Sequence, residues 1–165
     1  MTMIPPFSTK HYQSYSTPPE AVAPLIPYLR KKNIRTIWEP AAGDGFLANW
    51  LRKQGFNVIA TDLSQGIDFL KTNLTTLYDA IITNPPFNQR THFLRRSYYL
   101  GKPFCLLMPL LINTELASLV KQHGIELFIL SRRIRFIKDK KRMDRSPFNV
   151  AWFCRGVLPK QLIIV

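Results

Sequence analysis

Residues 35–63 read RTIWEPAAGDGFLANWLRKQGFNVIATDL, and this stretch decides the fold class. A short apolar run at residues 35–40 is broken by the glycine-rich turn 41–45, and an amphipathic segment then runs to Gly55. A second apolar run follows at residues 57–63. Strand, tight turn, helix and strand in this order predict a β-α-β unit, whose strands lie parallel because the helix crosses over the sheet.

The rest of the chain continues the alternation of strands and helices. Further strands are expected at residues 78–83, 102–110, 125–131, 132–137 and 149–158. Further helices are expected at residues 17–32, 91–101 and 114–124, with a short turn or helix at 65–75. The pattern predicts an α/β fold with a three-layer, doubly wound, mostly parallel sheet of seven strands. The closing strands follow one another without a helix, so an antiparallel hairpin is expected at one edge.

We expect one domain over residues 1–165, with an irregular arm at residues 1–16 and no separate target-recognition domain. The net charge is +13, from 23 Lys and Arg against 10 Asp and Glu, which favours a nucleic-acid partner over a merely soluble basic protein. The two cysteines lie in apolar runs and read as buried thiols of a reducing compartment. The chain starts with no secretory signal pattern, and no apolar run reaches the roughly 20 residues that span a bilayer. These features predict a cytoplasmic protein without a membrane partner.

Three stretches fall at the carboxyl ends of predicted strands, where open α/β sheets bind ligands. The glycine turn 41–45 offers free amides at a helix start, and Asp62 is suited to ribose hydroxyls, although both also occur in ordinary turns. The third stretch is TNPPFN, residues 83–88. Its two prolines donate no hydrogen bond and force Asn84 into an extended or turn conformation. The stretch is either a strand-ending turn or a rigid platform that presents an amide, two carbonyls and an aromatic ring.

The order EPAAGDG, ATDL, IDFL and YDAIITNPPF resembles the S-adenosylmethionine-dependent methyltransferases that methylate amino groups, especially adenine-N6 DNA methyltransferases. YSTPPEAV is similar to an upstream motif of that family, and RRIRF with SPFNVAWF to the end strands of its small phage- and prophage-type members. The resemblance covers nearly the whole chain, although the arm around IPPFSTKHYQSY aligns with no motif. It implies a Rossmann-like class I methyltransferase fold, S-adenosylmethionine as cofactor, S-adenosylhomocysteine as product and no metal.

The resemblance also implies a catalytic site at Asn84, Pro85, Pro86 and Phe87. The Asn84 side-chain oxygen and the Pro85 carbonyl would accept the two hydrogens of the target amine, which localises its lone pair for attack on the sulfonium methyl group. Phe87 would stack on the target base once that base is out of any helix. The resemblance implies further cofactor contacts. At the methionine part they are Thr17, Pro18, Glu39, Pro40, Ala41, Gly43 and Gly45, and Asn84 is a further contact. Asp62 would bind the ribose, Leu63 would lie against the adenine ring, and Asp68 and Phe69 would lie at the adenine edge.

Residues 132–145 contain eight Lys or Arg and two Asp, which makes them the first candidate for phosphate contact. The alternative is a solvated charge run. The candidate nucleic-acid contacts are Arg133, Arg135, Lys138, Lys140, Lys141, Arg142 and Arg145, with Arg90, Arg95 and Arg96 from the helix after NPPF and Phe148 near the target base. Phe148 could equally be a core residue. His92 and His123 are read as surface or packing residues, and Trp38, Trp50 and Trp152 as core.

Two alternatives stay open from the sequence. One is an RNA adenine-N6 or guanine-N2 methyltransferase, since NPPF also occurs there, and the resemblance of the two flanks favours DNA. The other is a non-catalytic nucleic-acid-binding subunit. Because no segment is left for target recognition, we expect weak or short sequence specificity, or recognition shared with a second subunit or homodimer, in a bacterial or phage-infected cytoplasm.

Overall fold

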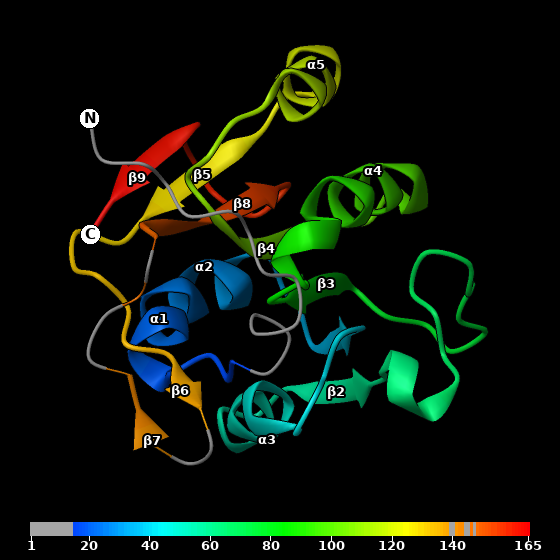
Figure 1. Cartoon of the computed structure of the whole chain (residues 1–165). Helices are drawn as coiled ribbons and strands as arrows, with labels where there is room; N and C mark the ends of the chain where they lie inside the picture. Colours follow the sequence, from blue (N-terminus) through cyan, green and yellow to red (C-terminus); the bar gives the residue numbers. More distant parts are fainter. Residues whose placement is uncertain (1–14, 139–140, 144–145, 147) are drawn as a thin grey trace.

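The computed structural model describes residues 15–138, 141–143, 146 and 148–165 (Figure 1). The helices are α1 (Pro19–Val22), η1 (Ala23–Leu25), α2 (Ile26–Lys31), α3 (Phe46–Lys53), η2 (Leu63–Gln65), η3 (Phe87–Gln89), α4 (Arg90–Leu100) and α5 (Thr114–His123). The strands are β1 (Thr36–Glu39), β2 (Asn57–Ala60), β3 (Ala80–Thr83), β4 (Phe104–Pro109), β5 (Glu126–Ile129), β6 (Ile137–Lys138), β7 (Lys141–Arg142), β8 (Val150–Arg155) and β9 (Leu162–Ile164).

Seven of these strands form one sheet in the order β2-β1-β3-β4-β8-β5-β9. Strands β2, β1, β3 and β4 are parallel neighbours, β8 runs antiparallel to both β4 and β5, and β9 is parallel to β5. The chain winds outward from β1 to β2 and then returns to place β3 on the other side of β1. The order of strands therefore reverses between β1 and β3, which is where open α/β sheets form their ligand crevice.

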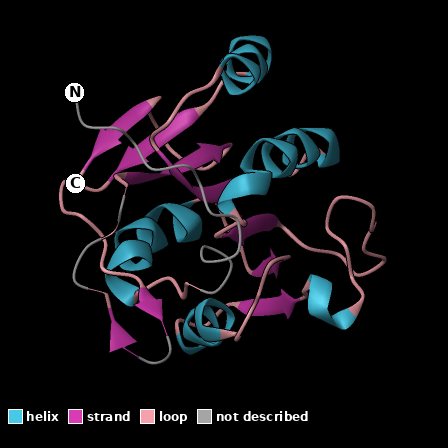
Figure 2. Cartoon of the chain, viewed as in Figure 1, coloured by secondary structure: helices cyan, strands magenta, loops and turns pink. Residues whose placement is uncertain are grey.

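Helices cover both faces of the sheet and create a three-layer molecule (Figure 2). Alternate strand residues point to opposite faces, so neighbouring side chains enter different hydrophobic clusters. Ile37 and Ile82 belong to the cluster beneath α1, α2 and α3, whereas Trp38 and Ile81 belong to the cluster beneath α4 and α5. Nearly continuous apolar strands are what a sheet buried on both sides requires.

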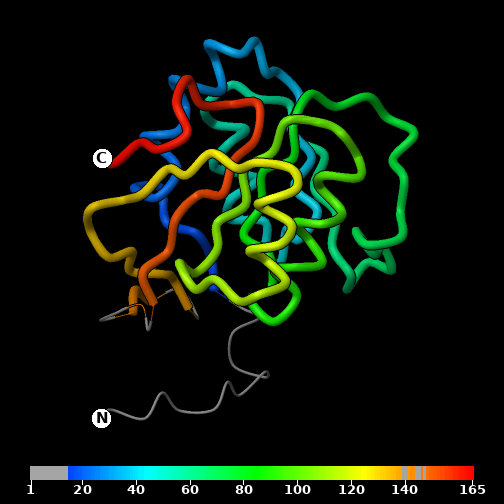
Figure 3. Tube along the Cα trace, turned by 90° about the horizontal axis from the view of Figure 1, so that it is seen from above, coloured from blue at the N-terminus to red at the C-terminus, as the bar shows by residue number. Residues whose placement is uncertain are grey.

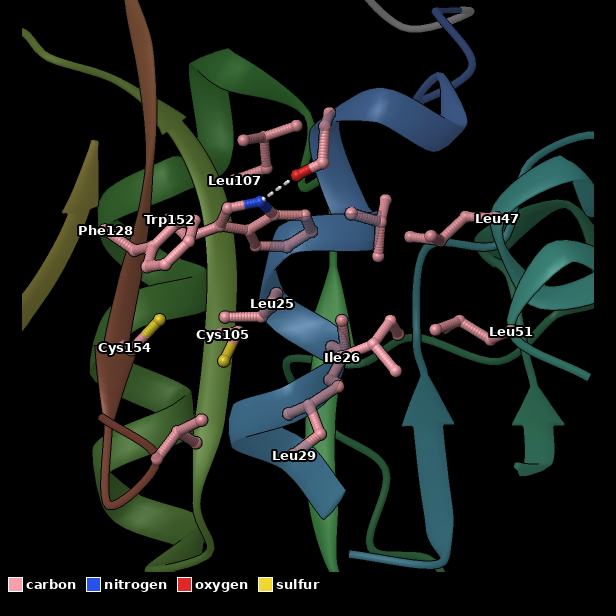
Figure 4. Close-up of a cluster of buried hydrophobic side chains, with 14 of the residues drawn as sticks. Leu25, Ile26, Leu29, Leu47, Leu51, Cys105, Leu107, Phe128, Trp152 and Cys154 are labelled. Atoms are coloured by element: carbon pink, nitrogen blue, oxygen red, sulfur yellow. Dashed lines mark hydrogen bonds between the residues drawn. The ribbon is translucent and has the colours of Figure 1, made fainter. Parts of the chain in front are cut away.

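Prolines divide the first helical run into short elements. Pro24 and Pro27 lie within it, and it passes from α1 through the 3-10 turn η1 into α2. The run is joined to the sheet by Trp152 of β8, whose indole Nε1 donates a 2.7 Å hydrogen bond to the Ala21 carbonyl (Figure 4). Cys105 and Cys154 lie directly opposite each other on β4 and β8 in the same buried layer, and both are free thiols.

The predicted fold class is confirmed: the sheet is mostly parallel, has seven strands, and carries the antiparallel pairing of β5 with β8 towards one end. The strand predicted at residues 132–137 is wrong. Ile134 and Phe136 are buried and Arg133 and Arg135 exposed, so the side chains alternate as expected, but the backbone does not join the sheet.

The seventh strand is instead β9, which forms the edge beside β5. The loop 66–79 lies at the opposite end of the molecule from β9 (Figure 3). Of the arm predicted at residues 1–16, residues 1–14 lie outside the described residues. Ser16 forms a two-bond antiparallel bridge with Ile137, with N–O distances of 2.8 and 3.1 Å.

Candidate functional site

The carboxyl ends of β1, β2 and β3 bring the three predicted stretches together. Glu39 is the last residue of β1, and its register partner is Ala60 at the end of β2. The Ala42 amide donates to the Thr61 carbonyl at 3.0 Å, which draws the glycine turn towards the end of β2. Asn84 directly follows β3 on the other side of β1.

The glycine turn adopts a backbone that only glycine accommodates easily. Gly43 has φ 52° and Gly45 has φ 78°, and Gly45 leads directly into α3. The Gly43 amide donates to Asp62 Oδ2 at 3.0 Å, and Ser64 donates to Asp62 Oδ1 through its amide and its hydroxyl. Partial burial would raise the pKa of Asp62, but these hydrogen bonds outweigh it and lower that pKa. Asp62 is therefore a carboxylate that is held in place and half-exposed at the strand ends.

Glu39 is a buried carboxylic acid, 1% exposed. Burial raises the pKa of Glu39 to about 8, and the negative charge of Asp62 raises it further. The Thr83 hydroxyl and the Ala41 amide, which donates to Oε1 at 3.2 Å, have the opposite effect and lower the pKa. Glu39 thus holds a proton at the crevice near neutral pH.

Asn84 presents an open acceptor. Its Nδ2 donates to the Tyr15 carbonyl at 3.3 Å, while Oδ1 is buried and has no hydrogen-bond partner within the described residues. The other buried side-chain atoms without a partner in that part of the chain are Thr83 Oγ1 and Arg90 Nε. All three belong to the eight residues that run from the end of β3 into α4. Unpaired buried polar atoms are costly and rare, and they gather here at one place.

Beyond Asn84, some backbone carbonyls accept hydrogen bonds within the protein and one does not. The Pro86 carbonyl accepts from the Gln89 amide at 2.8 Å, and the Phe87 carbonyl accepts from Arg90 at 3.1 Å. Among the hydrogen bonds of the described residues, none reaches the Pro85 carbonyl. Two acceptors on adjacent residues, Asn84 Oδ1 and Pro85 O, remain for a ligand.

Phe87 differs from the expectation of an exposed ring. It is 5% exposed and packs edge-on against Phe136 and Phe148, with ring centroids 6.2 and 6.4 Å away. Phe148 itself is half-buried, packs against the cluster beneath α1, α2 and α3, and lies beside Phe87, so its contact with a target base stays a prediction. Phe148 is therefore the more accessible of the two rings.

Residues 15–18, which we call the strap, lie across the strand ends. Ser16 Oγ donates to Asp44 Oδ2 of the glycine turn at 2.6 Å, and the Tyr15 carbonyl accepts from Asn84. Thr17 and Pro18 are buried behind this contact. The contact predicted between Thr17, Pro18 and the methionine part of the cofactor stays a prediction, and Ser16 and Asp44 themselves were not singled out from the sequence. Asp44 sits in the glycine turn, but nothing in the pattern pairs it with a serine 28 residues earlier.

The residues expected to contact the adenine of the cofactor differ in their exposure. Leu63 is 70% exposed beside Asp62, and Asp68 is half-exposed, with Oδ1 capping the Leu70 amide. Phe69 is 2% exposed, and its ring is packed against Trp38 and Phe93, so it is a core residue. Pro40 is buried and Ala41 half-buried at the start of the glycine turn.

The basic residues differ in how far protein contacts occupy their charged groups. Arg96 donates to the Phe69 and Thr72 carbonyls and to Asn73 Oδ1, so it anchors the loop 66–79 and is not available to phosphates. Arg95 pairs with Glu115, and Arg142 with Glu20. The remaining candidates lie beside the NPPF residues and the strap, on a surface that we call the rim. Arg90 donates to the Phe87 carbonyl, Arg133 donates to Asn149, and Lys138 lies over the Tyr15 ring. Lys141 is the register partner of Lys138, and both Arg135 and Lys141 are exposed. Lys140 and Arg145 lie outside the described residues.

Two other features bear on ligands. His92 is exposed, and His123 stacks on Tyr98 beside a cavity of about 250 Å³ that lies at the amino end of β4, away from the strand ends described above. Within the described ranges, no cluster of three His, Cys, Asp or Glu side chains could hold a metal ion. In the same ranges no helix has the length and apolarity needed to cross a bilayer.

No protein-family model matches this chain, and no curated protein is significantly similar to it. Among solved structures, a precorrin-6y C5,15-methyltransferase from Geobacter metallireducens is 13% identical, with a TM-score of 0.42 over 85% of this chain and 91% of that chain. A putative methyltransferase from Thermoplasma acidophilum is 16% identical, with a TM-score of 0.33 over 79% of this chain and 60% of that chain. Likenesses at this level assign neither a reaction nor a substrate, because one fold hosts many functions.

Proposed function

We propose that the protein transfers a methyl group from S-adenosylmethionine to the exocyclic N6 amine of adenine in DNA, with weak or short sequence specificity. The observation that carries the proposal is the buried, unpartnered Oδ1 of Asn84 at the carboxyl end of β3. An acceptor left open in a protein interior is stabilised once a donor binds to it. A planar amine with two hydrogens suits this site, because the Pro85 carbonyl is open as well.

The two acceptors address the chemical difficulty of the reaction. The amine lone pair of adenine is delocalised into the ring, which makes the nitrogen a poor nucleophile. Hydrogen bonds from its two protons to Asn84 Oδ1 and Pro85 O pull the nitrogen towards tetrahedral geometry and localise the lone pair. Pro85 and Pro86 fix the backbone that carries both oxygens, so little reorganisation is needed during transfer. The proton leaves after transfer, and no strong general base is required.

The crevice between β1 and β3 has side chains that fit the cofactor. Gly43 and Gly45 allow a close backbone approach, the half-exposed Asp62 suits ribose hydroxyls, and the exposed Leu63 beside it suits an adenine ring. When bound, S-adenosylmethionine supplies the electrophilic sulfonium methyl group. The residues of this chain bind it and orient the amine in line.

DNA is the proposed partner because the basic side chains Arg133, Lys138 and Lys141 lie on the rim that carries Phe148, beside Asn84 and Phe87. Phosphate contacts of this kind position a strand without reading its sequence. The proposal therefore includes low specificity, or target recognition shared with a second subunit or a homodimer. RNA is the alternative substrate, since the same groups would hold its phosphates.

The test is mass spectrometry of nucleosides after incubation with S-adenosylmethionine and unmodified DNA or RNA, each single- and double-stranded. We expect N6-methyldeoxyadenosine from the wild type. Asn84→Ala removes the amine acceptor together with the hydrogen bond to the Tyr15 carbonyl. It should lower transfer at least about a hundredfold, while the protein still binds the cofactor through its other contacts. Asn88→Ala, at an exposed position four residues on, is the matched control and should stay active.

Each other outcome changes the assignment. A methylated ribonucleoside would move the protein to the RNA group. Bound cofactor with no methylated nucleoside from any substrate would favour the non-catalytic subunit. An N84A variant as active as the wild type would rule out the proposed role of Asn84.

A further inference from the structure

We propose that the strap, residues 15–18, is a positioning element that sets the orientation of the Asn84 carboxamide, with the Ser16 hydroxyl as the link that ties this orientation to the glycine turn. The inference rests on the proposed function and adds to it a residue, Ser16, that touches neither the amine nor the methyl group. Its basis is the set of hydrogen bonds that the strap forms with three separate segments.

The orientation matters because a carboxamide has two unlike ends. Its nitrogen only donates and its oxygen only accepts, and the two are exchanged by a half-turn about one bond. The Tyr15 carbonyl accepts, so it pairs with Nδ2 of Asn84 at 3.3 Å and leaves Oδ1 as the open acceptor. The reversed orientation would set two oxygens against each other at Tyr15. It would also aim an NH₂ group at the target amine, where an acceptor is needed.

The Tyr15 carbonyl is itself held from two sides. On one side, Ser16 forms both backbone hydrogen bonds of the bridge to Ile137, and the Tyr15 ring lies 6.1 Å from the Phe136 ring. On the other side, Ser16 Oγ donates to Asp44 in the glycine turn at 2.6 Å. Ser16 thus connects the segment that carries the basic side chains, the turn proposed to hold the cofactor, and the carbonyl that orients Asn84.

A Ser16→Ala variant removes the bond to Asp44 and keeps the backbone bridge. With the carbonyl less well fixed, both orientations of Asn84 become populated, and only one is productive. We expect kcat to fall about tenfold. The KM for DNA and the dissociation constant for S-adenosylmethionine should stay within about twofold, because their proposed contacts are intact. Ser16→Thr keeps the hydroxyl and should restore kcat.

Two further variants separate this role from a general effect on folding. Asp44→Ala breaks the same hydrogen bond from its exposed end, together with the bond that Asp44 accepts from the Phe46 amide, and should lower kcat at least as much. Ser131→Ala makes the same chemical change at an exposed residue after β5 and should behave as the wild type. A readout independent of activity is the side-chain amide of Asn84 in nuclear magnetic resonance spectra. Its Nδ2 protons should exchange with solvent faster in S16A than in the wild type.

The outcomes distinguish this inference from the proposed function. If the wild type methylates no nucleic acid, the proposed function fails, and the exchange measurement still decides whether Ser16 holds Asn84. An active wild type with S16A at full kcat would overturn the inference and leave the function standing. Weaker cofactor binding by S16A with unchanged kcat at saturation would also overturn it, since Ser16 would then serve only the glycine turn.

Discussion

A single proton distinguishes Glu39 from the other carboxyl group at the strand ends. Asp62 is half-exposed and receives three hydrogen bonds, whereas Glu39 is fully enclosed and receives one from the Ala41 amide. The two environments drive their pKa values in opposite directions, Glu39 up to about 8 and Asp62 down. Of these two neighbouring carboxyl groups, only Asp62 therefore carries a negative charge near neutral pH.

This difference makes stability depend on pH in a defined direction. Between the ordinary pKa of a glutamate, 4.5, and about 8, the folded state keeps the Glu39 proton that the unfolded state releases. Wild-type stability should therefore fall relative to Glu39→Gln as pH rises through this window, by at most about 1.4 kcal/mol per pH unit. Urea denaturation of both proteins at pH 6 and pH 8 measures it. Parallel curves would mean that Glu39 is already ionised in the fold.

Residue types were easier to predict than the surroundings of each side chain. NPPF, the glycine turn and Asp62 stand together at the strand ends because the position of a strand end follows from local sequence. Phe87 and Phe69 were expected to face ligands, yet both rings are buried. Nothing in a local pattern states which partners, such as Phe136 or Trp38, will arrive from elsewhere in the chain to cover them. The Ser16–Asp44 bond escaped prediction for the same reason.

Within helix α4, two adjacent arginines have different surroundings. Arg95 is exposed and pairs with Glu115 of α5, whereas Arg96 is half-buried and donates three hydrogen bonds to the loop 66–79. The loop has little regular structure, so Arg96 substitutes for the backbone pairing that a strand would provide there. Helical periodicity sends neighbouring residues in different directions, and the sequence alone could not tell which arginine faced the loop.

The two arginines form a matched pair for mutagenesis. Arg96→Ala should lower the free energy of unfolding by about 1.5–3 kcal/mol, since hydrogen bonds from a charged donor to partly buried acceptors are lost. Arg95→Ala should cost no more than about 1 kcal/mol, as for other surface ion pairs. Trypsin cleavage after Lys71 should accelerate only in R96A. Equal effects in both variants would contradict the anchoring role of Arg96.

Among the strands, the wrong prediction concerns a segment whose structure depends on which strands pair in the sheet. Residues 132–137 alternate apolar and basic side chains as a strand would, and the buried Ile134 and Phe136 obey that alternation. They do not pair within the seven-stranded sheet, in which β8 lies between β4 and β5. The short run Leu162–Ile164 pairs with β5 instead. Periodicity predicts which side chains are buried, but the choice of partner depends on the whole sheet.

On the scale of the whole molecule, positive charge is in large excess, at +13. Some of that charge is neutralised by internal pairs, such as Arg142 with Glu20, which joins β7 to α1. Lys141, its neighbour on β7, is exposed. The cations that contribute to binding a polyanion are therefore fewer than the composition suggests.

This division gives a prediction for the salt dependence of DNA binding. Lys141→Ala should weaken binding and lower the slope of log affinity against log salt concentration by about 1, the loss of one phosphate contact. Arg142→Ala should change the slope less, because its charge is already paired, and Glu20→Ala should strengthen binding by freeing it. Fluorescence anisotropy across a salt series measures all three. Identical slopes for K141A and the wild type would remove this hairpin from the interface.

The insertion of β8 between β4 and β5 has a consequence for folding of the nascent chain on the ribosome. Strand β5 is synthesised before β8, yet it is joined to β4 and the strands beyond it only through β8. Until residues 150–155 emerge from the exit tunnel, one edge of β4 and both edges of β5 remain unpaired. Nascent chains stalled before that point should bind chaperones that recognise apolar strands, and release from them should coincide with the arrival of one late segment.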